Sequence, residues 1–99
     1  MLRLYDEKPI MIFTIDDDVK IGVDFCNIKM KMKPCQFRLF HNYLFSISKK
    51  LDESSDTVEL LLVKNSLNVT ISIGHFFQLF NAVSSVMNKK FGNTIIFQN

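Results

Sequence analysis

Residues 20–32 alternate between apolar residues and lysine, glycine or aspartate, with a single interruption at Cys26-Asn27. A two-residue period places the apolar side chains of a β-strand on one face of a sheet. A two-residue turn at Cys26-Asn27 would bring the apolar side chains of both strands onto the same face. We therefore predict a β-hairpin with one apolar face. Its expected cross-strand pairs are Phe25 with Ile28, Val23 with Met30, and Ile21 with Met32.

An amphipathic helix is predicted directly after this hairpin. Pro34 suits the first turn of a helix, because the ring fixes φ near a helical value and no N–H is needed there. Beyond it, apolar residues recur every three or four positions, at Phe37, Phe40, Leu44, Ile47 and Leu51. This spacing places them along one side of a helix.

The order of two strands and a helix occurs a second time in residues 57–91. Residues 28–32 match residues 69–73 at an offset of 41, and residues 36–41 match residues 76–81 at an offset of 40. We interpret the two halves as a duplicated ββα unit. The apolar stripe predicted for the second helix is Phe76, Phe77, Phe80, Val83, Met87 and Phe91.

A chain of 99 residues provides for one small domain with one core. Neither ββα unit can bury its apolar face alone, so we expect the hairpins to form a mostly antiparallel sheet with both helices packed on one face. This arrangement belongs to the α+β class. The expected segments are N-terminal strands and an acidic turn (1–18), the first unit (19–51), a linker (52–56), the second unit (57–91) and a C-terminal strand (92–99).

Two short patterns lie between Phe25 and Leu44. The first is Phe-Cys-Asn-Ile at residues 25–28, and the second places Phe37, Phe40 and Leu44 as Phe-x-x-Phe-x-x-x-Leu. Both are similar to the Phe-Gly-Asn-Ile strand and the helix pattern of an uncharacterised family of small Bacteroidota proteins, a domain of unknown function. The resemblance covers about a fifth of the chain. It implies this fold and a bacterial cytoplasmic setting, and it brings no established activity.

The N-terminal segment also bears on where the protein is found. Charges at Arg3, Asp6, Glu7 and Lys8 leave no apolar core for a secretory signal. Without such a signal, the two cysteines of the chain are most simply reduced thiols in a reducing compartment. We therefore expect a cytoplasmic protein.

The chain offers few groups for catalysis or metal binding. The Cys and His residues are not spaced as in zinc sites: Cys26, Cys35, His41 and His75. A nucleophilic pair would join Cys35 to a histidine, but no acid partner for that histidine is evident. The three glycines are too far apart for a phosphate-binding loop. We expect no catalytic residue, no metal and no cofactor.

The lysines of the first hairpin define an alternative function. Lys29, Lys31 and Lys33 share one face of a strand, and Lys20 is expected across from Lys33. This strip would suit a small nucleic-acid-binding regulator. The overall charge of +2 does not favour that partner. No aromatic residue is expected among the lysines and Asp24 lies with them, so we prefer a solvated edge strand. A small-ligand protein with a pocket between helices and sheet is the third alternative.

Several apolar residues fall where water is expected. Phe45 lies opposite the apolar stripe of the first helix, and Leu61 and Val63 alternate out of phase with the apolar face of the second hairpin. The outer face of the second helix carries no charge before Lys89. Depletion of charge beside apolar residues is typical of interfaces. We therefore predict a non-catalytic protein-interaction or regulatory module that acts as a homodimer. Its expected interface is Phe45, Leu61, Val63, Gln78, Ala82 and Ser85.

Overall fold

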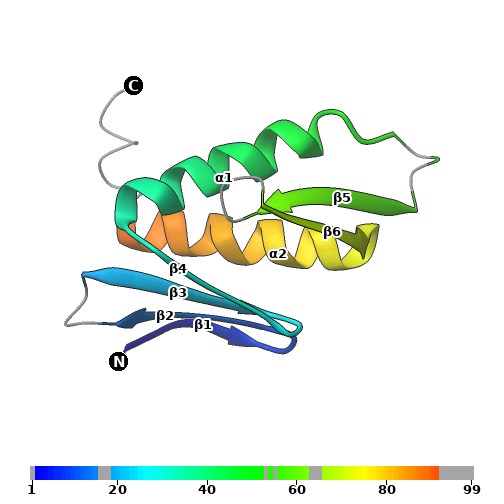
Figure 1. Ribbon diagram of the computed structural model, residues 1–99. Helices are drawn as coiled ribbons and strands as arrows, with labels where there is room; N and C mark the ends of the chain where they lie inside the picture. The colour runs from blue at the N-terminus through cyan, green and yellow to red at the C-terminus, as the bar shows by residue number, and fades with distance from the viewer. Residues whose placement is uncertain (1, 16–18, 53, 55, 63–65, 92–99) are drawn as a thin grey trace, which may run out of the picture.

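The computed structural model of the protein describes residues 2–15, 19–52, 54, 56–62 and 66–91 (Figure 1). The elements in chain order are β1 (Leu2–Glu7), β2 (Ile10–Ile15), β3 (Lys20–Phe25), β4 (Ile28–Met32), α1 (Pro34–Ser48), β5 (Thr57–Leu62), β6 (Leu67–Ser72), α2 (Ile73–Val86) and a π-helical turn at Met87–Phe91. The α+β class and the two ββα units are confirmed. The expected acidic turn at 16–18 and the C-terminal strand at 92–99 lie outside the described residues.

The first hairpin has the register expected from its sequence. Its strands pair through Phe25 with Ile28, Val23 with Met30, and Ile21 with Met32. Cys26 occupies the first turn position with a φ of 57°, in the left-handed region that this tight turn requires. The backbone N–H of Cys26 donates to the carbonyl oxygen of Pro9 at 3.0 Å, which joins the turn to the start of β2.

The two hairpins lie in separate sheets, contrary to the expectation of one shared sheet. Strands β1, β2, β3 and β4 form a four-stranded antiparallel sheet in that order, and β5 and β6 form a two-stranded sheet. The second hairpin packs on α2 instead of on β4. Its edge strand β5 is tied to α1, because the N–H of Leu61 donates to the hydroxyl of Tyr43 at 2.8 Å. A side chain of α1 thus accepts the hydrogen bond that a neighbouring strand would have accepted from Leu61.

Both helices cover the same face of the four-stranded sheet, as expected (Figure 1). Helix α1 contacts β3 and β4, whereas α2 contacts β1 and β2 and also the β5–β6 hairpin. The core between these layers contains the fully buried residues Ile12, Ile21, Val23, Phe25, Phe37, Leu44, Leu60, Phe76, Leu79 and Val83.

The buried side of α2 differs from the one expected. Phe77, assigned to the apolar stripe, is 40% exposed, and Ala82, assigned to the outer face, is fully buried. Leu79 and Val86 are buried as well. The physical reason is that α2 packs against the large sheet and the second hairpin together. A helix enclosed from two directions buries a wider arc than a single stripe, and that arc is centred away from Phe77.

The two ββα units correspond at one offset of 39 residues. The buried residues Phe37, Phe40 and Leu44 of α1 correspond to Phe76, Leu79 and Val83 of α2. The residues that precede the helices, Lys33 and Ser72, have the same separation. This offset differs from the 41 and 40 read from the sequence, since apolar spacings of three and four allow several neighbouring alignments.

Candidate functional site

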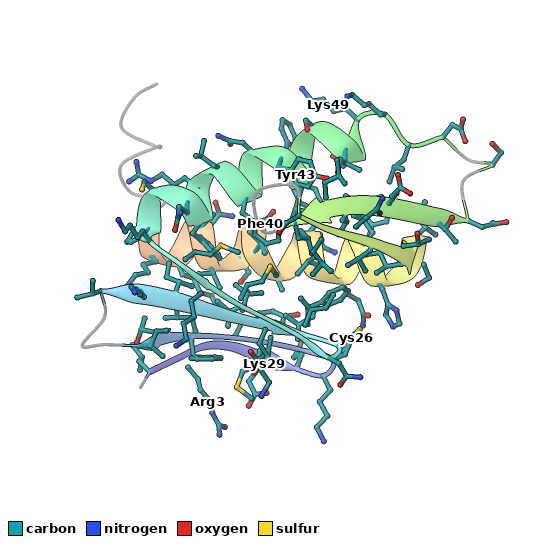
Figure 2. All side chains as sticks on the ribbon, in the orientation of Figure 1. Arg3, Cys26, Lys29, Phe40, Tyr43 and Lys49 are labelled. Carbon is teal, nitrogen blue, oxygen red and sulfur yellow. The ribbon has the colours of Figure 1, made fainter. Side chains whose placement is uncertain are left out.

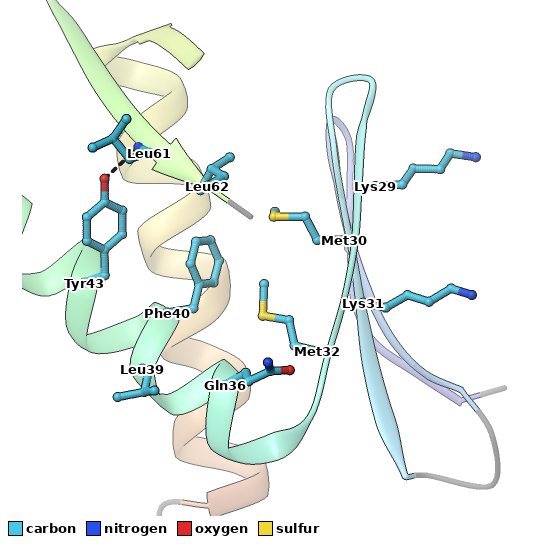
Figure 3. Close-up of a pocket in the computed structure, with 10 residues that line it drawn as sticks. All are labelled: Lys29, Met30, Lys31, Met32, Gln36, Leu39, Phe40, Tyr43, Leu61 and Leu62. Atoms are coloured by element: carbon cyan, nitrogen blue, oxygen red, sulfur yellow. Dashed lines mark hydrogen bonds between the residues drawn. The ribbon is translucent and has the colours of Figure 1, made fainter. Parts of the chain in front are cut away.

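A groove of about 590 Å³ lies between β4, α1 and the end of β5 (Figure 3). Its lining is mostly apolar, and each element supplies adjacent side chains to it. These are Met30 and Met32 from β4, Leu39 and Phe40 from α1, and Leu61 and Leu62 from β5. Since the three elements come from both ββα units, the groove exists only in the assembled fold.

The alternation of β4 divides its side chains between the groove and the opposite face of the sheet. Met30 and Met32 point into the groove, and Lys29 and Lys31 point away from it (Figure 3). Phe40 and Leu62 point toward these methionines, whereas Leu39 and Leu61 are directed away from them and are 67% and 44% exposed (Figure 3). The groove therefore presents apolar side chains to water beside a strand with basic residues on its other face.

The polar side chains of the groove already have hydrogen-bond partners. The Tyr43 hydroxyl accepts from the N–H of Leu61 at 2.8 Å, and Gln36 Oε1 accepts from the N–H of Lys33 at 2.8 Å. The Gln36 bond satisfies the N–H of the residue that precedes α1. Both groups therefore stabilise the walls of the groove.

The outer edge of β4 is open. The bond from Cys26 to Pro9 shows that backbone groups at even positions of β3 face β2. Because these groups alternate sides along a strand, the odd positions of β3 face β4 and pair with its even residues. The N–H and C=O groups of Lys29 and Lys31 thus point off the edge of the sheet. Within the described ranges, no other strand pairs with this edge.

The lysines of the first hairpin are only partly brought together. Lys29 and Lys31 are exposed on the face away from the helices, where Figure 2 also shows Arg3. Lys20 is half-buried, and Lys33 lies beyond the end of β4 at the start of α1. The expected pairing of Lys20 with Lys33 is therefore absent from the paired residues of β3 and β4.

This face of the sheet contains an aromatic ring that sequence reasoning did not place there. The ring of Phe13 lies over Gly22, so close that a Cβ atom at Gly22 would be 2.5 Å from Phe13 Cε2. Gly22 is the cross-strand neighbour of both Phe13 and Lys31. The expectation of no aromatic residue among the lysines considered one hairpin and not the neighbouring β2, where Phe13 lies two strands from Lys31. The signal available in the sequence was Phe13 itself, because the alternation of β2 places odd-numbered residues on the face away from the helices.

The predicted interface residues do not form one surface. Phe45, Leu61 and Gln78 are exposed, and Ser85 is half-buried. Ala82 is buried in the core, so its assignment to an interface was wrong. Val63 lies outside the described residues.

Phe45 instead belongs to an aromatic surface on α1 and α2. Its ring centroid lies 6.2 Å from that of Phe80, and the ammonium of Lys49 lies 4.4 Å from the centroid of Phe45. His41 stacks on the other ring of this pair, at 5.9 Å from Phe80. Because successive helix residues turn by about 100°, Phe45 lies on the side of α1 opposite Tyr43 and the groove. We call Phe45, Phe77 and Phe80 the aromatic surface.

The imidazole of His41 lies between α1 and α2 and has a lowered pKa. Burial lowers the pKa of His41, since the imidazole between α1 and α2 loses part of the hydration of its charged form. Its Nε2 shares a hydrogen bond of 3.0 Å with Ser84 Oγ. This bond joins α1 to α2, so the role of His41 in the described structure is to connect the two helices.

The thiols of Cys26 and Cys35 are both exposed and free. Among the residues that the structure describes, no three His, Cys, Asp or Glu side chains are close enough together to hold a metal ion. In the same part of the chain, no helix has the length and apolar character needed to cross a bilayer.

No family model, no curated protein sequence and no solved structure matches this chain significantly. The resemblance to the Bacteroidota family therefore stays a prediction.

Proposed function

We propose that the chain is a cytoplasmic, non-catalytic protein-binding module, and that the groove between β4, α1 and β5 receives a segment of a partner protein. The observation that carries this proposal is a mostly apolar groove beside an open strand edge, with the exposed residues Leu39 and Leu61 in its lining. Apolar surface in a preformed groove is removed from water when a partner inserts its own apolar side chains, and this burial favours binding.

The chemistry of the groove favours a protein segment over a small molecule. Sites for small ligands combine apolar walls with a few polar side chains that converge on the ligand. Here Tyr43 and Gln36 are already bonded within the fold. The backbone N–H and C=O groups of Lys29 and Lys31 lie at the edge of the groove, and a peptide backbone complements them.

The same proposal includes self-association through the aromatic surface. Phe45 is 46% exposed and lies next to Phe80, with Phe77 exposed on the adjoining turn of α2. Exposed aromatic residues that cluster on a helical face are typical of protein interfaces. A homodimer formed there leaves the groove open, because the two surfaces lie on opposite sides of α1.

A selection from a random peptide library tests the binding module without assuming a partner. We expect peptides that bind the full chain and lose about tenfold or more in affinity for Leu39→Ser, which removes an exposed apolar side chain from the groove lining. Phe77→Ser is the matched control, since it removes an exposed apolar side chain far from the groove and should leave this binding unchanged. Failure to select any peptide, or equal loss in both variants, would overturn the proposal.

A second candidate function uses the outer face of the four-stranded sheet. The Phe13 ring lies over Gly22, which is the cross-strand neighbour of Lys31, and an aromatic ring with basic residues on one face is the combination that single-stranded nucleic acids bind. The measurement is binding of an oligonucleotide over a salt series. For this candidate, affinity should fall steeply with salt and drop in Lys31→Glu and in Phe13→Ala. Binding that is insensitive to both substitutions would exclude this face.

A further inference from the structure

We propose that the segment bound in the groove is an extended strand that pairs with the open edge of β4 and alternates acidic and apolar side chains. This inference rests on the proposed binding function and specifies its partner. Pairing would extend the sheet from four strands to five. The acidic side chains would lie with Lys29 and Lys31, and the apolar ones would enter the groove.

The backbone of β4 supplies the first argument. The N–H and C=O groups of Lys29 and Lys31 point off the edge, and in the described chain no strand pairs with them. An extended peptide satisfies such groups by adding a strand. The opposite edge of the sheet is less suited, since β1 changes register between Arg3 and Tyr5 and such a bulge interrupts regular pairing.

The positions of the side chains supply the second argument. Residues directly opposite each other in neighbouring strands lie on the same face, with Cβ atoms about 5 Å apart. Partner residues opposite Met30 and Met32 would therefore enter the groove, toward Phe40 and Leu62 (Figure 3). Those opposite Lys29 and Lys31 would project with the lysines on the other face (Figure 3).

Charge decides which kind of strand fits. On β3, Lys29 has Asp24 as its cross-strand neighbour, but Lys31 has Gly22. Lys31 thus lacks a directly opposed acidic residue within the sheet. A partner strand with glutamate or aspartate opposite Lys31 would supply it, whereas a partner with lysine there would be repelled.

Charge also argues against a second copy of this chain at the same edge. The outward backbone groups belong to Lys29 and Lys31, so an antiparallel pair of two β4 strands would bond these residues to each other. Every such register places lysine directly opposite lysine. Like charges in that position are destabilising, and edge lysines are a common means of preventing self-pairing.

The test uses three peptides of about eight residues, a length typical of single strands. The first alternates glutamate and valine. The second has lysine in place of glutamate, and the third is the glutamate peptide with alternate amides N-methylated, which blocks edge pairing without changing charge. Binding is measured by titration of the full-length chain, and amide hydrogen exchange is followed at Lys29 and Lys31.

We expect the glutamate peptide to bind at least about tenfold more tightly than either control and to slow exchange of both amides. Lys31→Glu should reverse the preference between the glutamate and lysine peptides, and Lys29→Glu should do so less, because Asp24 lies beside Lys29. Lys33→Glu is the charge-matched control outside the strand and should keep the parent preference.

Three results would overturn strand pairing. Slow exchange at Lys29 and Lys31 in the free chain would show that the edge is already covered by another part of the chain or by a second copy. Equal binding of the N-methylated peptide would show that the backbone is not used. Binding without protection of these amides would place the peptide elsewhere. If library peptides still depend on Leu39, the binding module stands and only the strand is refuted; if no library peptide binds, the module itself fails.

Discussion

The hydroxyl of Tyr43 accepts a hydrogen bond of 2.8 Å from the backbone N–H of Leu61, and this bond joins α1 to the outer edge of β5. It connects the two ββα units, since Tyr43 belongs to the first unit and Leu61 to the second. The bond also makes the edge of β5 different from the edge of β4. The edge of β5 is bonded to a helix at this point, whereas the edge of β4 remains open beside the groove.

The substitution Tyr43→Phe removes this bond and leaves the N–H of Leu61 without its partner. We expect a loss of about 1 kcal/mol in the free energy of unfolding, as for a typical intramolecular hydrogen bond. Urea denaturation measures it. Tyr5→Phe is the control, because the hydroxyl of Tyr5 donates to Glu7 on the surface and its removal should change stability by less than about 0.5 kcal/mol. Equal losses in the two variants would contradict the structural role of the Tyr43 bond.

Leu60 and Leu61 are neighbours in β5 with opposite environments. Leu60 is fully buried, so Leu60→Ala should cost about 2–5 kcal/mol through lost burial and the cavity that remains. Leu61→Ala should cost less than about 1 kcal/mol, since that side chain is exposed to water. Thermal or chemical unfolding compares the two. A reversed order would mean that the register of β5 is off by one residue.

Gly22 is required by the ring that covers it. A Cβ atom at this position would be 2.5 Å from Phe13 Cε2, so Gly22→Ala must displace the ring. We expect a destabilisation of about 1 kcal/mol, because the ring is half-buried and can swing outward at some cost. In a Phe13→Ala background the same substitution should be neutral or stabilising, since alanine lowers the conformational entropy cost of glycine. A double-mutant cycle measures this coupling, and additive effects would rule out the predicted clash.

His41 gives the fold a pH dependence of known sign. Burial lowers its pKa, so the folded protein binds a proton there less readily than the unfolded chain, whose histidine titrates near about 6.5. This stabilisation is present above that value and is lost as pH falls through the folded-state pKa. Unfolding midpoints between about pH 8 and pH 5 should therefore fall more steeply for the parent chain than for His41→Gln. Parallel pH profiles would show that His41 does not couple to folding.

Self-association through the aromatic surface predicts a dimer in solution. Light scattering over a concentration series should show a dimer for the parent chain and a folded monomer for Phe45→Ser, because the substitution removes an apolar contact from the centre of the interface. Leu39→Ser, on the groove side of α1, should remain dimeric. A parent chain that is monomeric at every concentration would refute the dimer.

The elements that sequence analysis predicted well are those whose contacts are local. The register of β3 and β4 follows from the alternation on both sides of Cys26-Asn27, because a two-residue turn allows one pairing only. The buried side of α1 was also predicted, since Phe37, Phe40 and Leu44 leave a single stripe.

The candidate site was harder to predict because it is assembled from distant segments. Leu61 stands out in the sequence by its alternation, but Leu39, which lies beside Phe40 of the apolar stripe, is not among the predicted site residues. The two residues line one groove because α1 and β5 meet, which no spacing within either element reveals. The exposure of Leu39, given its place beside the stripe, is a signal that becomes informative only after β4 and β5 are placed.

By itself, the sequence determined the hairpins, the helices and the α+β class of the protein, because periodicity and turn chemistry act over a few residues. The tertiary structure alone decided that α2 buries Ala82 and exposes Phe77, and that the edge of β5 is bonded to Tyr43 while that of β4 is open. These outcomes depend on which surfaces compete for the same neighbours in space. Burial against two layers overrides the apolar stripe of one helix, and a single tyrosine hydroxyl substitutes for a neighbouring strand.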